Sequence, residues 1–216
     1  MLALYGHPFS SYTWKALIAL YANDIPFEFR MVDADHPENG EFVQSAGPLG
    51  KFPVLLDGEK VIVESTLIVE YLVRHHGGGG VLLPDDPDAA LGMRMLDRVF
   101  DNYVMNLMQP VVEEYIRNPA NPDMARIQEV RERLTRTYRW LEGWLEHYPP
   151  VDHVTLIECA AAPSLFYADW VHPIAKEFPR LKRWRAHLLA LPPVKRCVDD
   201  ARPYRGNFPP GAPDRD

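Results

Sequence analysis

Segment 51–65 places the strongest constraint on how this chain can fold, because it carries the signals of a complete β-hairpin. The step Phe52–Pro53 opens a short apolar run, Asp57–Gly58 supplies a turn, and a second apolar run leads to Glu64–Ser65. An Asp-Gly pair between two apolar runs is a strong local hairpin signal. One hairpin could therefore present both an extended backbone edge and a charged contact to the same small ligand.

Strand and helix patterns alternate around this hairpin. Residues 2–5 form a short apolar run, residues 10–21 carry an apolar helical face, and residues 27–31 alternate as a strand does. Residues 38–46 favour a short helix, and residues 65–76 show a helical face again. The order β-α-β-α-β-β-α predicts an α/β domain, a mixed sheet covered by helices with a hairpin at one edge.

The pattern becomes all-helical after Pro87. Apolar positions at helical spacing predict four helices, over 96–108, 124–145, 155–171 and 179–190. The first of these is expected to end at Gln109–Pro110, and the tail from Pro203 to be loosely ordered or draped on the surface. We expect an N-terminal domain over 1–76, a linker over 77–87 that includes Gly77 to Gly80, and a helical domain over 88–216.

The composition narrows the classes of function. The chain has 216 residues, a formal net charge of −7 and no basic block, so neither nucleic acid nor an anionic membrane is an expected partner. Its two cysteines, Cys159 and Cys197, are far apart, which supports neither a disulfide framework nor a metal site. With no signal peptide or membrane-spanning run in the sequence, we expect a cytoplasmic protein.

Two further local motifs have a structural meaning. Thr155 followed three residues later by Glu158 is a capping box that starts a helix. A cis Phe52–Pro53 bond would turn the backbone N–H and C=O of Phe52 outward, free to pair with an extended peptide; a trans turn is the alternative.

Taken together, these motifs resemble the cytosolic glutathione transferases over nearly the whole chain. The matching segments are Ser10–Ser11 after the first strand, Gly-Pro-Leu-Gly-Lys-Phe-Pro-Val-Leu at 47–55, Val-Glu-Ser at 63–65, and the capping box. The resemblance implies a thioredoxin-like N-terminal domain and an all-α C-terminal domain. Residues 10–20 are similar to the zeta-class pattern, so the chain resembles zeta members or bacterial serine-type members.

Several positions depart from the zeta pattern. Tyr12 stands where zeta members carry a cysteine, and Lys15 and Leu17 replace two arginines. Gly47 replaces a frequent Asn, and Glu158 replaces the usual Asp of the capping box. The departures at Tyr12, Lys15 and Leu17 count against maleylacetoacetate isomerisation and leave the expectation of glutathione binding intact, and the Glu158 change is conservative.

The resemblance assigns the thiol chemistry to the start of the first helix. A hydroxyl donor and a helix N-terminus both favour a thiolate, and Ser10 and Ser11 lie where both effects are available. Ser10 is the first choice as thiol activator and Ser11 the second, with a helix N-cap as the structural alternative. Tyr5 is a minor third candidate, since some classes use a tyrosine at the end of the first strand.

The same resemblance assigns the contacts of glutathione, the expected co-substrate. The Phe52 backbone before Pro53 would pair with the cysteinyl portion, and Glu64 and Ser65 would hold the γ-glutamyl end. Lys51, or less favourably His36, would meet the glycyl carboxylate.

The second substrate is expected between the domains, where small-molecule pockets are common. Aromatic and thioether candidates there suggest a small apolar electrophile: Phe9, Tyr12, Tyr103, Met108, Tyr115 and Trp170. The leading hypothesis is glutathione transfer by a homodimer. The alternatives are glutathione-dependent isomerisation or peroxide reduction, and non-catalytic ligand binding.

Overall fold

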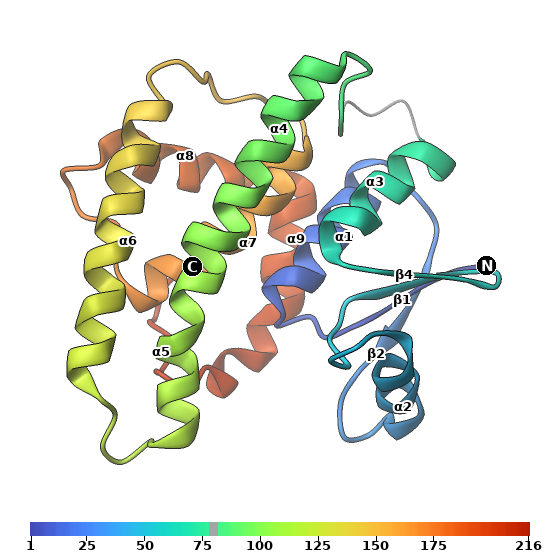
Figure 1. Cartoon of the computed structure of the whole chain (residues 1–216), viewed down its shortest axis with the longest axis horizontal. Helices are drawn as coiled ribbons and strands as arrows, with labels where there is room; N and C mark the ends of the chain where they lie inside the picture. Colours follow the sequence, from blue (N-terminus) through green and yellow to red (C-terminus); the bar gives the residue numbers. More distant parts are fainter. Residues whose placement is uncertain (78–81) are drawn as a thin grey trace.

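The structure is a computed structural model that describes residues 1–77 and 82–216. Residues 78–81 of the expected linker over 77–87 lie outside the described residues. Figure 1 shows a sheet-containing half and a helical half side by side, with α1 and α3 between the sheet and the helical half.

The N-terminal half has the predicted element order, which confirms the thioredoxin-like fold. Its elements are β1 (Leu2–Gly6), α1 (Ser11–Ala22), β2 (Glu28–Met31), α2 (Pro37–Ala46), β3 (Val54–Asp57), β4 (Lys60–Val63) and α3 (Ser65–His76). The sheet order is β2-β1-β3-β4. Strand β1 runs parallel to β2 and antiparallel to β3, and β3 and β4 are antiparallel, as a hairpin requires.

The hairpin of segment 51–65 closes through a short turn. Asp57 pairs with Lys60 across the ladder, which leaves Gly58 and Glu59 as the turn residues. Gly58 has a φ of 60°, a left-handed conformation that glycine adopts without a steric penalty. The turn chemistry of the sequence therefore sets the register that delivers Glu64 to the start of α3.

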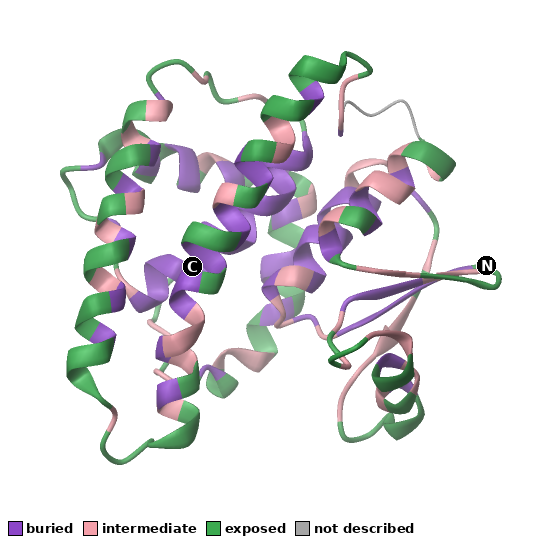
Figure 2. Cartoon of the chain, in the orientation of Figure 1, coloured by how far each residue is buried: buried purple, intermediate pink, exposed green. Residues whose placement is uncertain are grey.

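The two faces of the sheet belong to different cores. Leu2, Leu4 and Leu55 join the large core that also contains α1, α3 and the helical half. Ala3, Tyr5 and Val54 point to the opposite face, where α2 covers them. Figure 2 shows the buried residues concentrated between the sheet, α1 and α7.

The helical half begins with one long rod that the sequence pattern did not predict in full. It consists of α4 (Pro87–Phe100), a π-helical segment (Asp101–Met105) and α5 (Asn106–Arg117). The expected end at Gln109–Pro110 is wrong, because Pro110 lies inside α5. Burial of Val111 beyond the proline continues the apolar stripe, and this packing offsets the one backbone hydrogen bond that a proline cannot make.

Further helices complete this half, and two of its elements were not predicted. They are α6 (Met124–Trp144), α7 (Leu156–Val171), α8 (Pro179–Ala190), α9 (Pro192–Ala201) and a short 3-10 helix, Arg202–Asn207. The helix α9 and the 3-10 helix are the unpredicted ones, and α9 packs on α1 and α8. The tail beyond them is draped on the surface: Asp216 pairs with Arg202 and Arg205, and Arg215 pairs with Asp169.

The predicted capping box starts α7, the most buried helix. The Thr155 hydroxyl accepts from the backbone N–H of Ile157 at 3.1 Å, and the Glu158 carboxylate accepts from that of Thr155 at 3.0 Å. The backbone N–H of Leu156 also donates to the carbonyl of Leu82 at 2.8 Å, which ties the segment between the halves to this helix. In the part of the chain that the structure describes, no helix is long and apolar enough to cross a membrane.

Candidate active site

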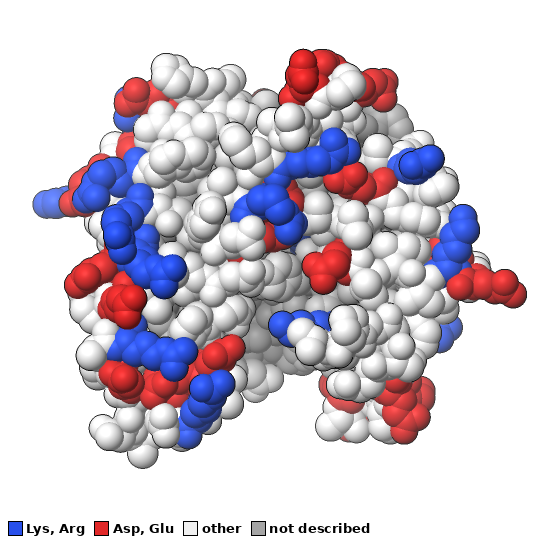
Figure 3. Space-filling model, in the orientation of Figure 1, with Lys and Arg blue, Asp and Glu red and all other residues white. Residues whose placement is uncertain are grey.

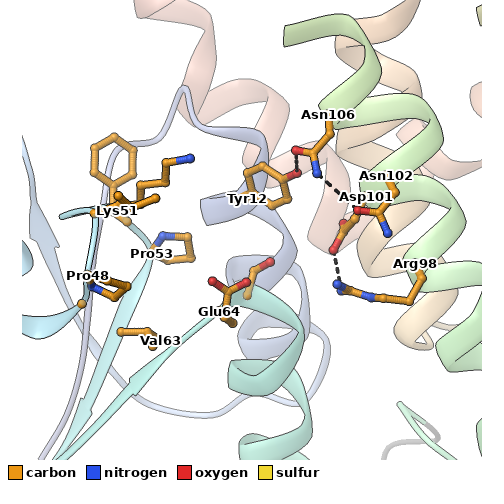
Figure 4. A pocket seen from close by; sticks show the side chains of 14 residues that line it. Tyr12, Pro48, Lys51, Pro53, Val63, Glu64, Arg98, Asp101, Asn102 and Asn106 are labelled. Carbon is orange, nitrogen blue, oxygen red and sulfur yellow. Dashed lines mark hydrogen bonds and ion pairs between the residues drawn. The ribbon is translucent and has the colours of Figure 1, made fainter.

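A cleft of about 320 Å³ lies between the sheet half and the rod of α4 and α5. Figure 4 shows the hairpin on one side of the cleft and the helical rod on the other. Figure 3 shows the hollow between the two halves. Acidic and basic side chains are interspersed on this face of the molecule. Its lining residues are Tyr12, Gly47, Pro48, Leu49, Lys51, Phe52, Pro53, Val63, Glu64, Ser65, Arg98, Asp101, Asn102 and Asn106. All five residues that the sequence assigned to glutathione binding are therefore brought together.

The entrance of the hairpin provides a free backbone edge. The Phe52–Pro53 bond is cis. The N–H and C=O of Phe52 form no hydrogen bond with any residue that the structure describes, since the ladder with β1 begins only at Val54. Unpaired backbone groups in a cleft are available to an extended peptide. The exposed Lys51 adds a cation beside this edge.

The exit of the hairpin provides a carboxylate and a helix start. Glu64 has a φ of 71°, a strained conformation for a residue with a side chain, and such strain is often found at ligand-binding sites. Its carboxylate is exposed and pairs with none of the described residues. Ser65 is the first residue of α3, where the N–H groups of the first turn lack helical partners and favour an anion.

The two serines lie at the start of α1, and neither lines the cleft. Ser10 is the N-cap residue, and its Oγ accepts from the backbone N–H of Thr13 at 3.2 Å. That bond uses a lone pair, so the hydroxyl hydrogen of Ser10 remains available to a ligand. Ser11 is buried. Capping and thiol activation are thus compatible at Ser10.

The two minor candidates lie away from the cleft. The buried Tyr5 accepts a hydrogen bond from Arg30 on the sheet face that α2 covers. His36 pairs with Asp33, with its Nδ1 2.7 Å from a carboxylate oxygen. Neither side chain lines the cleft.

Of the six residues expected to bind the electrophile, only Tyr12 lines the cleft. Met108 and Trp170 are buried in the core, and Tyr103 is 61% exposed. Phe9 and Tyr115 pack against the core from its edge.

The helical wall of the cleft consists of residues that sequence reasoning missed: Arg98, Asp101, Asn102 and Asn106. Behind it, the buried Lys15 ammonium pairs with Asp97 and with Asp101, and donates to the Thr66 hydroxyl at 2.9 Å. Arg98 also pairs with both aspartates. The available signal was the presence of Lys15, Asp97 and Asp101 on otherwise apolar helix faces, because buried charges need partners.

This charged cluster and Tyr12 differ from exposed groups in their acid–base behaviour. Burial raises the pKa of Asp101, and the nearby Lys15 opposes that rise. Burial, with the nearby Asp101 adding to it, raises the pKa of Tyr12, so its hydroxyl stays protonated at neutral pH. The Tyr12 hydroxyl donates to Asn106 Oδ1 at 2.7 Å.

The fold and the cleft define a class of two-domain proteins in which a thioredoxin-like domain precedes a helical domain and the site lies where they meet. Two family models match the chain in this order: the glutathione S-transferase N-terminal domain over residues 4–80, and the glutathione S-transferase C-terminal domain over residues 103–192. The chain belongs to the glutathione S-transferase family.

Curated relatives and solved structures agree with this assignment. The chain is 26% identical over 211 residues to glutathione S-transferase F6 of Arabidopsis thaliana, covering 91% of this chain and 99% of the relative. It is 26% identical over 209 residues to a probable maleylacetoacetate isomerase of Caenorhabditis elegans, covering 94% and 95%. A GSH-bound glutathione S-transferase of Methylobacillus flagellatus superposes with a TM-score of 0.79 at 25% identity, covering 91% of this chain and 98% of the other.

Proposed function

We propose that the cleft binds glutathione and that the protein is a glutathione transferase, which joins the glutathione sulfur to a small electrophile. The observation that carries this proposal is the meeting, in one cleft, of the unpaired Phe52 backbone, the unpaired Glu64 carboxylate and the start of α3. These three features match the amide, ammonium and carboxylate groups of a γ-glutamyl tripeptide.

Each part of glutathione has a chemically matched partner. The Phe52 N–H and C=O pair with the cysteinyl portion as a short strand would. Glu64 binds the γ-glutamyl ammonium, and Ser65 with the first-turn N–H groups of α3 binds the neighbouring carboxylate. Lys51 meets the glycyl carboxylate.

The chemical problem is to ionise a thiol whose pKa is about 8.5 when free. The Ser10 hydroxyl donates to the sulfur, and the N-terminus of α1 adds positive potential, so both favour the thiolate. The thiol proton leaves to solvent. The sulfur then forms a bond to the electrophilic carbon, while a leaving group departs with the electron pair of the bond that breaks.

Glutathione-dependent isomerisation is a second candidate, because one relative is a probable maleylacetoacetate isomerase. The positions that depart from the zeta pattern weaken the case for isomerisation. Lys15 is 1% exposed and is held by Asp97 and Asp101, so its charge does not reach a substrate in the cleft.

We also infer a cytoplasmic homodimer that resembles zeta or bacterial serine-type members. The support for a dimer is three exposed apolar side chains, Leu67 on α3 and Leu91 and Met95 on α4, on two helices that the Glu70–Arg94 ion pair joins. Sedimentation equilibrium would give twice the chain mass; a monomer at micromolar concentration would refute this assembly.

Calorimetric titration with glutathione, together with turnover of an activated aryl halide, tests the proposed site. Glu64→Gln keeps the shape of the side chain and removes the charge that meets the ammonium, so the Kd for glutathione should rise about tenfold or more. Glu59→Gln, in the exposed turn of the same hairpin, is the matched control and should leave the Kd unchanged. Equal affinities of the Glu64 variant and the unmodified protein would remove Glu64 from the site.

A further inference from the structure

The residues just before Ser10 are held by hydrogen bonds from both halves of the molecule. The Pro8 carbonyl accepts from the Nε1–H of Trp14, on α1, at 2.6 Å. The Phe9 carbonyl accepts from the hydroxyl of Tyr167, on α7, at 2.8 Å. Among residues 1–77 and 82–216, no backbone N–H donates to the Phe9 carbonyl. Within these residues, its hydrogen bond therefore comes from the helical half alone.

The peptide group between Phe9 and Ser10 is fixed at both of its polar atoms. Its carbonyl oxygen is held by Tyr167, and its N–H, which belongs to Ser10, donates to the His7 carbonyl at 2.9 Å. The backbone N–H of Phe9 also donates to His7 Nδ1 at 3.1 Å. Because a peptide group is planar, these hydrogen bonds fix the backbone from which the Ser10 side chain projects.

Tyr167 is suited to hold this carbonyl. Its side chain is 3% exposed, and burial raises the pKa of its hydroxyl well above the usual value for tyrosine, so the hydroxyl keeps its proton and donates. Its ring packs edge-on against the Phe9 ring, with the centroids 5.5 Å apart. The same side chain therefore packs on Phe9 and bonds its carbonyl, and loss of the hydroxyl would leave that carbonyl without this partner.

The C-terminal segment packs on both residues that form this hydrogen bond. Phe208 is buried after the 3-10 helix, and its ring centroid lies 6.2 Å from that of Tyr167 and 6.4 Å from that of Phe9. The Tyr204 ring lies 4.6 Å from the His7 ring. Aromatic pairs at such distances stabilise a fixed arrangement. The end of the chain thus supports the contact between α7 and the segment before Ser10.

We propose that Tyr167 is a positioning residue for thiol activation, because it holds, through the Phe9 carbonyl, the backbone that aims the Ser10 hydroxyl at the glutathione sulfur; this rests on the proposed transferase function. Tyr167 does not line the cleft, so it acts only through Ser10. Hydrogen bonds weaken steeply with poor geometry. A misaimed hydroxyl therefore favours the thiolate less, while the proposed glutathione contacts of segment 51–65 are unchanged.

The thiol pKa of bound glutathione in two tyrosine variants tests this inference. Tyr167→Phe keeps the ring and removes only the hydroxyl. Tyr138→Phe is the matched control, because Tyr138 is also buried and donates to a backbone carbonyl, that of His172, at 3.1 Å. In Tyr167→Phe the thiol pKa should rise by about half a unit or more toward the free value of about 8.5, with the Kd for glutathione changed less than about threefold. In Tyr138→Phe the thiol pKa should equal that of the unmodified protein.

The pH profile of turnover gives an independent measurement. Below the thiol pKa, the thiolate fraction falls about tenfold for each unit by which that pKa rises, so kcat of Tyr167→Phe with an activated aryl halide should be about 3- to 10-fold lower at about pH 6.5. The variant and the unmodified protein should converge above about pH 9, where the thiol is ionised in both. An equal loss at both pH values would mean a defect unrelated to thiol ionisation and would overturn the inference.

An unchanged thiol pKa in Tyr167→Phe, or an equal rise in both tyrosine variants, would overturn the inference as well. If Tyr167→Phe does not fold, Phe208→Leu decides: it loosens the packing on the Tyr167 ring and should also raise the thiol pKa, and the absence of a rise would refute the role of Tyr167. If the unmodified protein bound glutathione without lowering its thiol pKa, the proposed transferase function would fall, and this inference with it.

Discussion

Lys15 shows how one residue can connect the site to the rest of the molecule. Its side chain starts on α1, two residues after Thr13, and its ammonium is buried among Asp97, Asp101 and Thr66. Thr66 directly follows Ser65 in α3, and Asp101 lines the cleft. One buried cation therefore fixes α1, α3 and the helical rod relative to one another.

Removing this charge should be costly for stability. In Lys15→Met, the carboxylates of Asp97 and Asp101 stay buried but lose their main ion-pair partner. The free energy of unfolding should therefore fall by about 3 kcal/mol or more. Lys195→Met is the matched control: Lys195 pairs with Asp199 on the exposed surface of α9, where about 0.5 kcal/mol or less is expected. Urea unfolding measures both, and a loss in Lys15→Met no larger than that of the control would contradict this role.

Single residues of the cleft were predictable where they are neighbours in the sequence. Lys51 to Pro53 and Glu64–Ser65 belong to one hairpin, whose turn and register follow from local chemistry. Asn102 and Asn106 reach the same cleft only through the packing of a distant helix. No local pattern distinguishes them from ordinary solvated asparagines on a helix.

At the scale of elements, the rod of α4 and α5 shows why its cleft-facing residues could not be derived from spacing. Periodicity of 3.6 residues fits α4, but the segment Asp101–Met105 is π-helical. The wider π-helical turn rotates the residues of α5 relative to their positions in a regular α-helix. The residues of α5 that face the cleft are therefore not those that a 3.6-residue period predicts. Three of the four helical wall residues lie in this segment or border it: Asp101, Asn102 and Asn106.

The helix α9 was missed although a signal was present. Val194, Cys197, Val198 and Ala201 are buried and spaced by three, one and three residues, the pattern of a helical face. Two prolines at its start, Pro192 and Pro193, are also compatible with the first turn of a helix. The element order of the N-terminal half, by contrast, was predictable because strands, turns and helices alternate there with clear boundaries.

At the scale of the whole molecule, one hydrophobic core extends through both halves. Residues of β1, α1 and α3 belong to the same cluster as those of α4 to α9, and α1 packs on α7, α3 and α9. The helix α1, whose N-terminus is the proposed place of the thiol chemistry, is therefore buried between the two halves. We expect the halves to unfold together.

This shared core makes stability sensitive to alkaline pH. Burial raises the pKa of the thiols of Cys159 and Cys197 and of the Tyr138 hydroxyl, so these groups stay protonated when folded and ionise on unfolding. Burial of these protonated groups therefore contributes to the free energy of unfolding below their unfolded-state pKa values, which are about 8.5 for cysteine and about 10 for tyrosine. This contribution is lost as the pH rises above those values.

The free energy of unfolding should therefore fall above about pH 8.5, with a slope of up to about 1.4 kcal/mol per pH unit for each ionising group. Urea unfolding at a series of pH values measures this slope. Cys197→Ala should reduce the slope between about pH 8.5 and 10, whatever its effect on stability at neutral pH. A free energy of unfolding that stays constant to pH 10 would show that the buried thiols do not control alkaline stability.

The most direct test of the central claim, that the cleft and the start of α1 together bind and ionise glutathione, is the thiol pKa of bound glutathione. Ultraviolet absorbance of the thiolate, followed against pH with the protein in excess, measures it. We predict a pKa at least about one unit below the free value of about 8.5, and a return toward that value in Ser10→Ala with glutathione still bound. A bound thiol that titrates as free glutathione does, in the unmodified protein, would contradict the account.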